Sequence, residues 1–478
     1  AAALAAPAAQ AAFSMSMTSA APSNLQAGAH SNVVVNMTFT SANPGESLRD
    51  LDLDLPAGLL GNPNAVNALC SQSQFNNDNC PSASKVGEVD TVAHAKGRSG
   101  LALLFDADVD VGGNVYLLQP TGGEPARMGI ILKAEGIAAL GAVTPIKLQA
   151  PVTLRAPGDY GLTSVIRGIP NTASSALLGT LDIYVKSMKM TLYGTPPTNP
   201  KGPFLTNPTE CVPATFLARA TAHNNATAQA NRSFTPTGCT GGSSVPFEPT
   251  FDVAPKTQRA DQPTNLSVTI GFPGDAGGRA QSHLKSAVVT LPVGTALSPG
   301  VGANGLDACA DAQFAAAAAT PPACPARSKI GTVSFNTPLL GVLNGDVYLG
   351  APTAANPFRL LVYATLGAVR VKLTGVVSPD PQTGQLTATF SDLPRVPFTS
   401  FTLSFRGGDD AVLKAPPGCG TYAASARLEP YARPGTFVTR QATFNTNNCT
   451  TAPFAPSFAA GVDRALAGGD THLSLTVA

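Results

Sequence analysis

The octapeptide CPSASKVG, residues 80–87, returns as CPARSKIG at residues 324–331. These residue types are compatible with a metal clamp, a redox site, a phosphate-binding loop or a structural turn without chemistry of its own. A catalytic lysine in such a motif would have to be desolvated, so that its pKa falls. We favour the structural interpretation, in which Lys85 and Lys329 precede a strand and keep their ammonium groups in water.

The eight cysteines form four pairs whose members are close in the sequence. An even number of cysteines in an exported chain is typical of a disulfide framework. Each disulfide would stabilise the fold by ~2–4 kcal/mol, because it restricts the unfolded chain. A structural zinc site needs closer Cys and His spacing, and none of the five histidines has that spacing to a cysteine pair. The grouping therefore favours four disulfides: Cys70 with Cys80, Cys211 with Cys239, Cys309 with Cys324, and Cys419 with Cys449.

The segment FDADVDVGG places Asp106, Asp108 and Asp110 at alternate positions. Three such carboxylates could bind calcium, but an EF-hand loop also needs Gly at its sixth position and Glu at its twelfth. Val111 and Leu117 occupy those positions. Alternate residues of a strand share one face, so we favour a solvated strand edge over a metal site.

Motifs of common active sites are absent from the sequence. It contains no G-x-x-x-x-G-K-[ST] phosphate loop, no G-x-S-x-G nucleophile elbow and no H-E-x-x-H zinc motif. A Ser-His-Asp triad needs no local motif, but no histidine recurs at equivalent positions with a carboxylate partner. The sequence therefore predicts no catalytic residue, no cofactor and no resident metal.

The composition disfavours several classes of protein. Charged residues make up 12% of the 478 residues and the formal net charge is +1, so no basic surface is expected for nucleic acid or an anionic membrane. Tryptophan is absent, which disfavours a stacking platform for sugars or bases. With 46 Gly and 42 Pro residues, we expect many turns and few long helices.

The first residues, AAALAAPAAQAAFSM, resemble the end of a secretory signal peptide. Small apolar residues lead to an A-x-A cleavage pattern at Ala9-Gln10-Ala11, so we expect export to the cell surface or beyond. No other stretch reaches the roughly 18 uninterrupted apolar residues of a membrane helix. We expect no membrane insertion in this segment.

The chain contains an internal duplication, which is the strongest guide to its fold. The matching segments keep the same order in both copies. They are LDLPAG with VTLPVG, CSQSQF with CADAQF, CPSASKVG with CPARSKIG, GNVYLL with GDVYLG, PIKLQ with RVKLT, and GLTSVIRGIP with QLTATFSDLP. A third copy begins at the end, where VPFEPTFDVAP is echoed by APFAPSFAAGV. We expect that the natural protein extends beyond both ends of this sequence.

Strand patterns dominate both copies. Leu51, Leu53 and Leu55 alternate with aspartates, so one face of this strand should be buried and the other wet. Many other short segments are β-branched or aromatic and are bounded by Gly, Pro, Asn or Asp. The longest helix candidate is residues 306–319, with Asp307 as a possible N-cap, and its counterpart at residues 65–75 is shorter.

These patterns predict an all-β fold of tandem disulfide-stapled β-sandwiches, of the Ig-like or Greek-key kind, with very little helix. Each repeat is about twice the ~100 residues of an Ig-type sandwich, so we expect either two packed sandwiches or one with long insertions. The predicted organisation is a signal-peptide remnant at 1–12, repeat 1 at 13–242, repeat 2 at 243–450 and the opening strands of a truncated third repeat at 451–478.

The motifs LPAGLLGNP, CxxxQF, CPxxSKxG, PFLTNPTEC and TGC before PFEP form a specific set. In combination, they resemble large, exported, repeat-built proteins of high-GC Gram-positive bacteria. The resemblance covers nearly the whole chain from Phe13 and implies an extracellular β-rich fold, but it supplies no catalytic residues. The second repeat departs from it where APPGC, ending at Cys419, replaces TNPTEC.

We therefore predict a secreted or cell-surface structural or adhesive repeat protein without catalytic activity. Its expected partners are cell-wall or surface glycans or copies of itself. One alternative is an array of carbohydrate-binding modules, which the low charge and many Asn and Thr residues favour and the lack of Trp disfavours. Another is a hydrolase whose site is built by loops between sandwiches.

Overall fold

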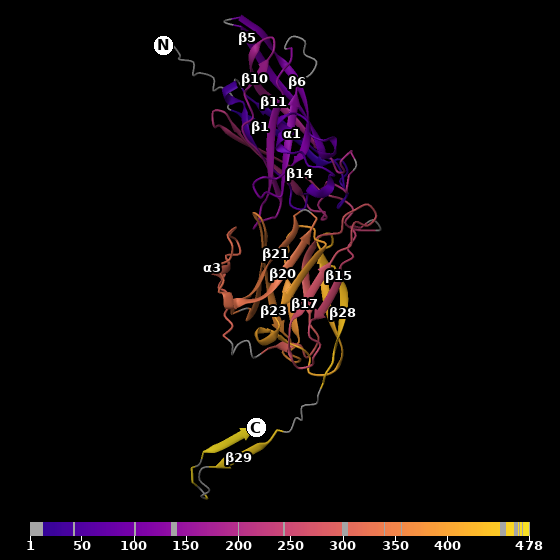
Figure 1. Ribbon diagram of the computed structural model, residues 1–478, viewed down its shortest axis with the longest axis vertical. Helices are drawn as coiled ribbons and strands as arrows, with labels where there is room; N and C mark the ends of the chain where they lie inside the picture. Colours follow the sequence, from indigo (N-terminus) through magenta and orange to yellow (C-terminus); the bar gives the residue numbers. More distant parts are fainter. Residues whose placement is uncertain are drawn as a thin grey trace, which may run out of the picture.

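The chain folds into two large β units that stand end to end along the long axis, as the computed structural model in Figure 1 shows. We call residues 13–241 unit 1 and residues 244–449 unit 2. The structure describes residues 13–41, 44–99, 102–134, 141–198, 200–241, 244–298, 305–338, 340–354, 356–449, 456–462, 467, 469–470 and 472–477.

Strands make up most of unit 1. They are β1 (Ser14–Pro22), β2 (Val33–Thr40), β3 (Leu48–Asp54), β4 (Leu60–Gly61), β5 (Lys85–Ser99), β6 (Ala102–Leu118), β7 (Ala126–Lys133), β8 (Ile146–Leu154), β9 (Leu162–Ile166), β10 (Thr172–Ser175), β11 (Gly179–Leu192), β12 (Leu205–Thr206), β13 (Ala214–Ala222) and β14 (Thr227–Phe234).

Unit 2 is built in the same way. Its strands are β15 (Thr250–Pro255), β16 (Pro263–Thr264), β17 (Leu266–Gly271), β18 (Leu284–Thr290), β19 (Ala296–Leu297), β20 (Lys329–Thr337), β21 (Gly341–Gly350), β22 (Phe358–Leu366), β23 (Val369–Pro379), β24 (Leu386–Phe390), β25 (Ser400–Phe405), β26 (Leu413–Lys414), β27 (Gly420–Pro430) and β28 (Val438–Thr446).

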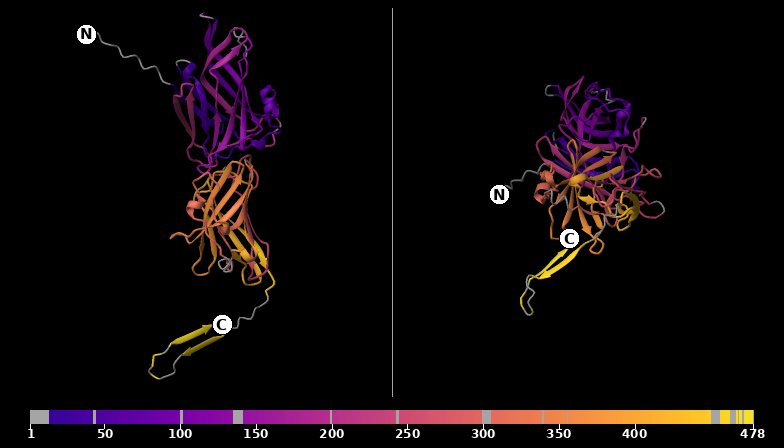
Figure 2. Two further views of the ribbon diagram at one scale, coloured as in Figure 1. Left: turned by 60° about the vertical axis from the view of Figure 1, so that its left-hand side comes forward. Right: turned by 60° about the horizontal axis from the view of Figure 1, so that its bottom comes forward.

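The two units share one strand order. It is β1-β2-β11-β5-β6-β7-β8-β9-β3-β13-β14 in unit 1 and β15-β17-β25-β20-β21-β22-β23-β24-β18-β27-β28 in unit 2. The first and last strands of each order, β1 with β14 and β15 with β28, also lie side by side. Each sheet therefore curls around its own core (Figure 2), which confirms the predicted all-β class.

Alternate side chains of the strands point into the core, as the sequence pattern predicts. Leu51, Leu53 and Leu55 are 1%, 5% and 7% exposed. Of the aspartates between them, Asp54 is also buried, at 8% exposed, where it pairs with Arg219 at 2.7 Å and accepts a hydrogen bond from the Thr163 hydroxyl at 2.7 Å. The charge of this buried carboxylate is thus compensated by close polar partners.

The helices are shorter than predicted. Instead of a helix over residues 306–319, the structure has α3 (Asp311–Phe314), and α1 is limited to Gln72–Asn76. Ala315 has φ +47°, a left-handed conformation that ends the helix, and Asp307 lies outside it. Single-turn 3₁₀ segments are η1 (Pro44–Glu46), η2 (Pro63–Ala65), η3 (Ser82–Ser84), η4 (Ala326–Ser328) and η5 (Gly408–Asp410).

A third element is the hairpin of β29 (Phe458–Val462) and β30 (Leu473–Val477). Phe458 pairs with Val477 there, as Phe251 pairs with Ile270 between β15 and β17. The hairpin therefore repeats the register of the hairpin that opens unit 2. The large hydrophobic side chains of this hairpin are 50–73% exposed.

Several predictions fall on residues that the structure does not describe. These are the signal-peptide remnant at 1–12 and the repeat boundaries at 242–243 and 450–451. Within the described part of the chain, no helix is both long and apolar enough to cross a membrane.

Candidate functional site

The recurring cysteine-proline motif closes a small disulfide loop in each unit. Cys70 is joined to Cys80 and Cys309 to Cys324, with Cα atoms 5.1 and 5.0 Å apart. Within the first loop, Ser71 and Gln74 form a capping box: the Gln74 amide donates to the Ser71 hydroxyl at 3.2 Å, and the Ser71 amide donates to the Gln74 side chain at 2.9 Å. The loop is therefore a compact, self-bonded cap on the sheet.

The Ser-Lys-x-Gly part of the motif is also structural. The buried hydroxyls of Ser84 and Ser328 donate to the carbonyls of Pro81 and Pro325, at 2.7 and 2.6 Å, and so close the 3₁₀ turn. A Cβ atom on Gly87 would lie 2.4 Å from the carbonyl oxygen of the neighbouring strand. The cysteine, the second serine and the glycine of the motif thus each have a structural role.

The motif lysines pair with carboxylates. Lys85 Nζ lies 2.7 Å from Glu88, and Lys329 Nζ lies 2.5 Å from Asp346. Partial burial works to lower the pKa of Lys85, but the bond to Glu88 and the charges of Glu88 and Tyr193 together raise that pKa above its ordinary value. A nucleophilic amine needs the opposite shift, so Lys85 acts as an ion-pair partner.

A buried lysine that the sequence interpretation missed lies beneath α3. Lys372 is 7% exposed and donates to the carbonyls of Phe314 and Ala315, at 2.7 and 2.8 Å. Burial, with Arg370 nearby, lowers its pKa. Lys147, its counterpart in unit 1, donates to the Asn76 carbonyl at the end of α1. Both lysines therefore satisfy the last carbonyls of a short helix, and the match of PIKLQ with RVKLT was the signal for it.

The far end of unit 1 carries an extension without a counterpart in unit 2. Strands β5 and β6 have 15 and 17 residues, whereas β20 and β21 have 9 and 10. We call the outer parts of β5, β6 and β11, residues 91–99, 102–110 and 179–187, the unit 1 tip. It has a small core of its own, formed by Ala95, Val109, Leu181 and Ile183, and it lies at the end of the molecule away from unit 2 (Figure 1).

The tip brings a histidine and two of the predicted aspartates together. His94 Nδ1 lies 2.7 Å from Asp108, and its Nε2 lies 2.6 Å from Asp106. Lys186 Nζ approaches Asp108 at 2.8 Å, and the Tyr184 ring lies 4.8 Å from the His94 ring. The bonds from Lys186 and then His94 lower the pKa of Asp108. The carboxylates are thus engaged by cationic and imidazole groups of adjacent strands.

Asp110 does not join this cluster. It lies opposite Val92 in the β5–β6 register, whereas Asp108 lies opposite His94. Within the described ranges, no three His, Cys, Asp or Glu residues are grouped as a metal site would need. Asp106, Asp108 and Asp110 all lie on an exposed face of the strand.

Backbone hydrogen bonds join the two units. The Ala280 amide donates to the Gly28 carbonyl at 2.9 Å, and Ala29 forms an antiparallel bridge with Arg279. The second disulfide of unit 1, Cys211 with Cys239, lies beside it (Cα–Cα 6.0 Å). Cys239 belongs to a small apolar cluster that unites Ala27 of unit 1 with Val245 and Ala432 of unit 2.

Ionic contacts reinforce the joint. Glu210, 8% exposed, forms an ion pair with Arg395 across the units. The Arg395 guanidinium also lies 4.6 Å from the ring centroid of Tyr431, a cation–π contact. Because both charges are partly removed from water, loss of either partner would leave the other poorly compensated.

His283 is buried in the joint. Its amide donates to the Thr209 hydroxyl of unit 1 at 3.1 Å, and its carbonyl accepts from the Tyr431 amide at 2.9 Å. Burial, together with the positive charge of Arg395, lowers the pKa of His283 to about 4. The ring is therefore neutral at physiological pH.

The arrangement nearest to a catalytic triad is also at the joint. His30 Nε2 lies 2.8 Å from Asp275, and His30 Nδ1 lies 3.1 Å from the Thr206 hydroxyl. Nδ1 also faces the Leu205 carbonyl at 3.3 Å. His30 thus links the two units.

Comparisons with known proteins give no family for the chain. No protein-family model and no curated protein matches it. Among solved structures, a C-terminal domain of the Streptococcus agalactiae AgI/II polypeptide BspA is similar at 8% identity, covering 91% of this chain and 99% of that chain with a TM-score of 0.22.

Two further solved structures belong to other bacteria. The Enterococcus faecalis MSCRAMM ACE, described as binding its ligands by the collagen Hug model, is 8% identical over 90% of this chain and 95% of that chain, with a TM-score of 0.19. The collagen-binding domain of the Erysipelothrix rhusiopathiae surface protein RspB is 9% identical over 71% and 89%, with a TM-score of 0.18. TM-scores of this size do not establish a common fold.

Proposed function

We propose that the chain is an extracellular, cell-surface structural and adhesive repeat protein without catalytic activity. The observation that carries this proposal is the bonded end-to-end joint between two units of one strand order. Interfaces between domains usually permit relative motion unless they are large and hydrophobic. Here backbone pairing, a buried histidine and a desolvated ion pair favour a fixed orientation, as a stiff stalk requires.

The disulfides support the extracellular location. The structure joins all eight cysteines in four disulfides and leaves none of them free. Such density is typical of proteins kept in an oxidising compartment outside the cytosol. The resemblance of its motifs to exported proteins of high-GC Gram-positive bacteria supports such a bacterium as the source and export of the chain from its cytoplasm.

The proposal extends the two units to a repeated array, with repeat 1 at 13–242, repeat 2 at 243–450 and the start of a third copy at 451–478. The β29–β30 register supports the third copy. The far end of unit 2 supports it as well, because it repeats a backbone bond that unit 1 makes beside the joint. The Asp261 amide donates to the Pro416 carbonyl at 3.0 Å in unit 2, and the Gly28 amide donates to the Pro208 carbonyl at 3.2 Å in unit 1.

Partners of such a protein would be cell-wall or surface glycans or copies of the chain itself. Repetition adds reach and multiplies binding surfaces without new chemistry. The unit 1 tip is the surface that we assign to contact, because it projects away from unit 2 and carries Lys186 and His94 beside carboxylates. A polar face of this kind suits a hydrogen-bonding partner better than an apolar one.

The experiment is surface plasmon resonance of the full chain over immobilised Gram-positive wall polysaccharide and over immobilised copies of the chain. We expect saturable binding to one of these surfaces, weakened in the tip variant H94A/K186A and unchanged in K285A, which alters an ion pair with Glu429 outside the tip. A monomer that binds neither surface would contradict the adhesive function. Hydrolysis of the polysaccharide that is lost in H30A would contradict the non-catalytic one.

A further inference from the structure

Unit 2 encloses an apolar cavity whose counterpart in unit 1 is nearly filled. The unit 2 cavity has a volume of about 280 Å³ and is lined by residues that include Leu291, Leu297, Leu349, Phe358, Phe405 and Val412. The equivalent space in unit 1 has a volume of about 50 Å³. We propose that the unit 2 cavity binds one hydrocarbon chain of an amphiphile, whose polar end remains at the mouth. This proposal does not rest on the adhesive function.

Strand register establishes that the two spaces are equivalent. Leu205 pairs with Gly61 between β12 and β4, and Leu413 pairs with Leu297 between β26 and β19. The residues that precede Leu205 and Leu413 are Phe204 and Val412. Gly61 and Leu297 therefore occupy one structural position, and Phe204 and Val412 occupy another.

Backbone bonds around these positions are also the same. The Asn62 amide donates to the Phe204 carbonyl at 2.7 Å, and the Ser298 amide donates to the Val412 carbonyl at 2.9 Å. The backbone thus follows the same path in both units, while the side chain at this position changes from Phe to Val. A difference in side-chain volume, rather than a different fold, accounts for the open space.

The Phe204 ring is the plug in unit 1. A Cβ atom on Gly61 would lie 3.7 Å from the Phe204 ring, so the ring rests against this glycine. In unit 2, Leu297 replaces the glycine and is 42% exposed, while Val412 is 7% exposed. The Leu297 side chain is therefore turned partly to solvent, and the shorter Val412 leaves the interior unfilled.

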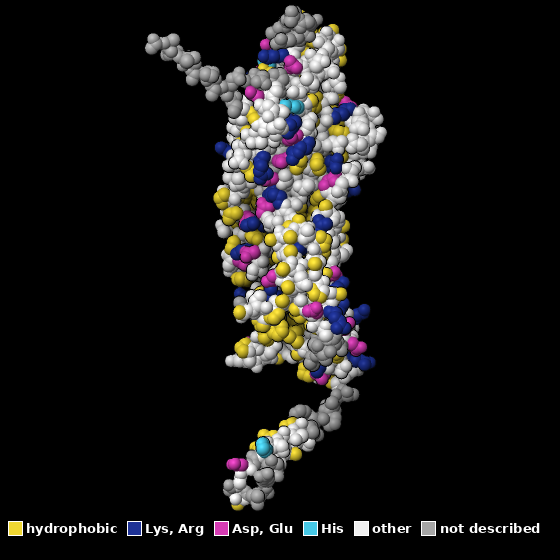
Figure 3. All heavy atoms as spheres, turned by 90° about the vertical axis from the view of Figure 1, so that its left-hand side faces the viewer, with side chains coloured by type: hydrophobic (Ala, Val, Ile, Leu, Met, Phe, Trp, Pro, Cys, Tyr) yellow, Lys and Arg dark blue, Asp and Glu magenta, His cyan; other side chains and the backbone are white. Residues whose placement is uncertain are grey.

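Solvent exposure indicates that the unit 2 cavity is open. Leu117 and Leu192 are buried in unit 1, at 1% and 6% exposed. Their counterparts by register, Leu349 and Phe405, are half-buried although both line the cavity. On the face drawn in Figure 3, hydrophobic side chains gather on unit 2, whereas charged side chains of both signs are spread over unit 1.

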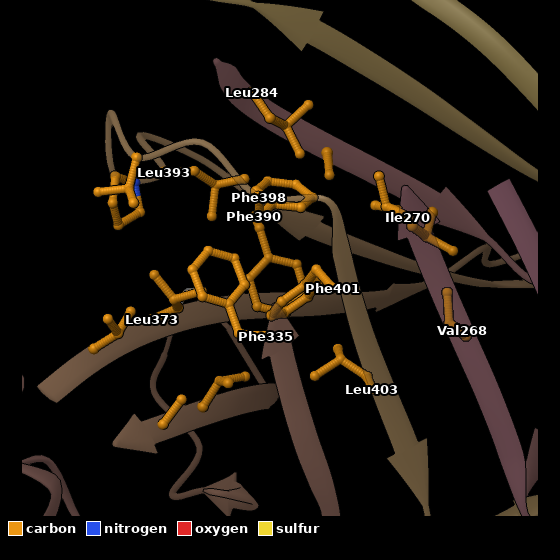
Figure 4. A pocket seen from close by; sticks show the side chains of 17 residues that line it. Val268, Ile270, Leu284, Phe335, Leu373, Phe390, Leu393, Phe398, Phe401 and Leu403 are labelled. Carbon is orange, nitrogen blue, oxygen red and sulfur yellow. The ribbon is translucent and has the colours of Figure 1, made fainter. Parts of the chain in front are cut away.

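A cluster of aromatic side chains lies next to the cavity. Phe390 belongs to its lining and also to the lining of a neighbouring void of about 50 Å³. Figure 4 shows that void, with Phe335, Phe398 and Phe401 grouped around it. The Phe335 ring lies 5.2 Å from Phe398 and 5.7 Å from Phe401. This packed cluster limits how deeply a ligand could enter.

The chemistry of the described lining selects an uncharged hydrocarbon. Arg359 is its charged residue, and the guanidinium is already bonded to Asp311 at 2.7 Å and to the Ala351 carbonyl at 3.3 Å. An apolar cavity of about 150 Å³ stays dry and binds benzene. The unit 2 cavity is larger than that and has an open end, so a chain longer than a single ring fits it.

The test is calorimetric titration of the full chain with straight-chain 1-alkanols of six to twelve carbons. We expect affinity to rise about fourfold per added methylene until the chain fills the cavity, and then to level off. The variant V412F/L297G transfers the plug and its glycine from unit 1 and should weaken binding at least tenfold. The matched control V342F places the same ring at Val342, which is 45% exposed on β21, and should bind as the wild type does.

Two outcomes would overturn the proposal: no saturable alkanol binding, or equal binding by V412F/L297G and the wild type. Flotation with phosphatidylcholine vesicles then distinguishes the source of the chain. Wild-type flotation that is lost in V412F/L297G assigns the site to a membrane lipid. Alkanol binding without flotation assigns it to a free single-chain amphiphile.

Discussion

Units 1 and 2 share a strand order but differ in strand length and in how well the core is filled. Unit 1 has a filled core and a long tip, whereas unit 2 has shorter strands and an open apolar cavity. Pairing register is kept because a slip of one residue would turn every buried side chain of a strand outward. Strand length and the size of single core residues are free to change, so function can diverge there while the scaffold stays the same.

The largest expected effect compares the plug with its counterpart. F204A should lower the free energy of unfolding of unit 1 by about 3–5 kcal/mol, because it empties a filled core. V412A should cost unit 2 less than half of that, since its side chain already borders open space. Denaturant titration read by hydrogen–deuterium exchange of peptides from each unit would measure both. Equal losses would contradict open space beside Val412, because V412A removes far fewer atoms than F204A does.

Removal of the disulfide bond that closes the small loop should lower the stability of both units to a similar degree. We expect C70S/C80S and C309S/C324S each to lower the free energy of unfolding by ~2–4 kcal/mol. The second loop is longer, with a sequence separation of 15 against 10, so its loss should cost about 0.4 kcal/mol more. Thermal unfolding of both variants would measure this. A much larger loss in one unit would indicate that its loop holds more than the local cap.

Acid should destabilise unit 2 through His283. The unfolded side chain takes up a proton below pH ~6.5, whereas the folded one remains neutral down to its pKa of about 4. The unfolded state therefore binds more protons between these values, and the free energy of unfolding should fall by about 3 kcal/mol as the pH drops from 6.5 to 4. Denaturant midpoints against pH would reveal the slope.

The matched variant for this pH dependence is H283S, which carries the residue that unit 1 has at the equivalent position, Ser47. It should lose the slope assigned to the histidine, whatever its stability at pH 7. An unchanged slope in H283S would assign the acid sensitivity to another group.

The smallest effects are expected at the unit 1 tip. H94A or K186A should change stability by less than about 1 kcal/mol, because exposed ion pairs contribute little. Calcium at millimolar concentration should leave the melting temperature unchanged, since Asp106 and Asp108 already face His94 and Lys186. A calcium-dependent rise that disappears in D106N/D108N would show instead that the aspartates form a metal site.

Local sequence patterns predicted much of the fold. The alternation at Leu51, Leu53 and Leu55 indicated a half-buried strand, and the cysteine spacing led to the same four pairs that the structure joins. The predicted helix over residues 306–319 was wrong, because alanine propensity gave way to the left-handed turn at Ala315 within the disulfide loop.

The joint and the cavity could not be read from the sequence. Glu210 and Arg395 are 185 residues apart, and no local pattern links them. The change from Phe204 to Val412 becomes visible after strand register has aligned the two units. The polar tip was equally hidden, because His94 meets Asp106 and Asp108 across a hairpin of unusual length.

We propose that the two units form one stiff body through their joint. The most direct measurement is pulsed electron–electron distance spectroscopy with spin labels at L177C and V293C, which replace residues that are 66% and 54% exposed in units 1 and 2. We predict one narrow distance distribution that broadens when E210A breaks the ion pair with Arg395. A broad distribution in the chain that retains Glu210 would contradict the account.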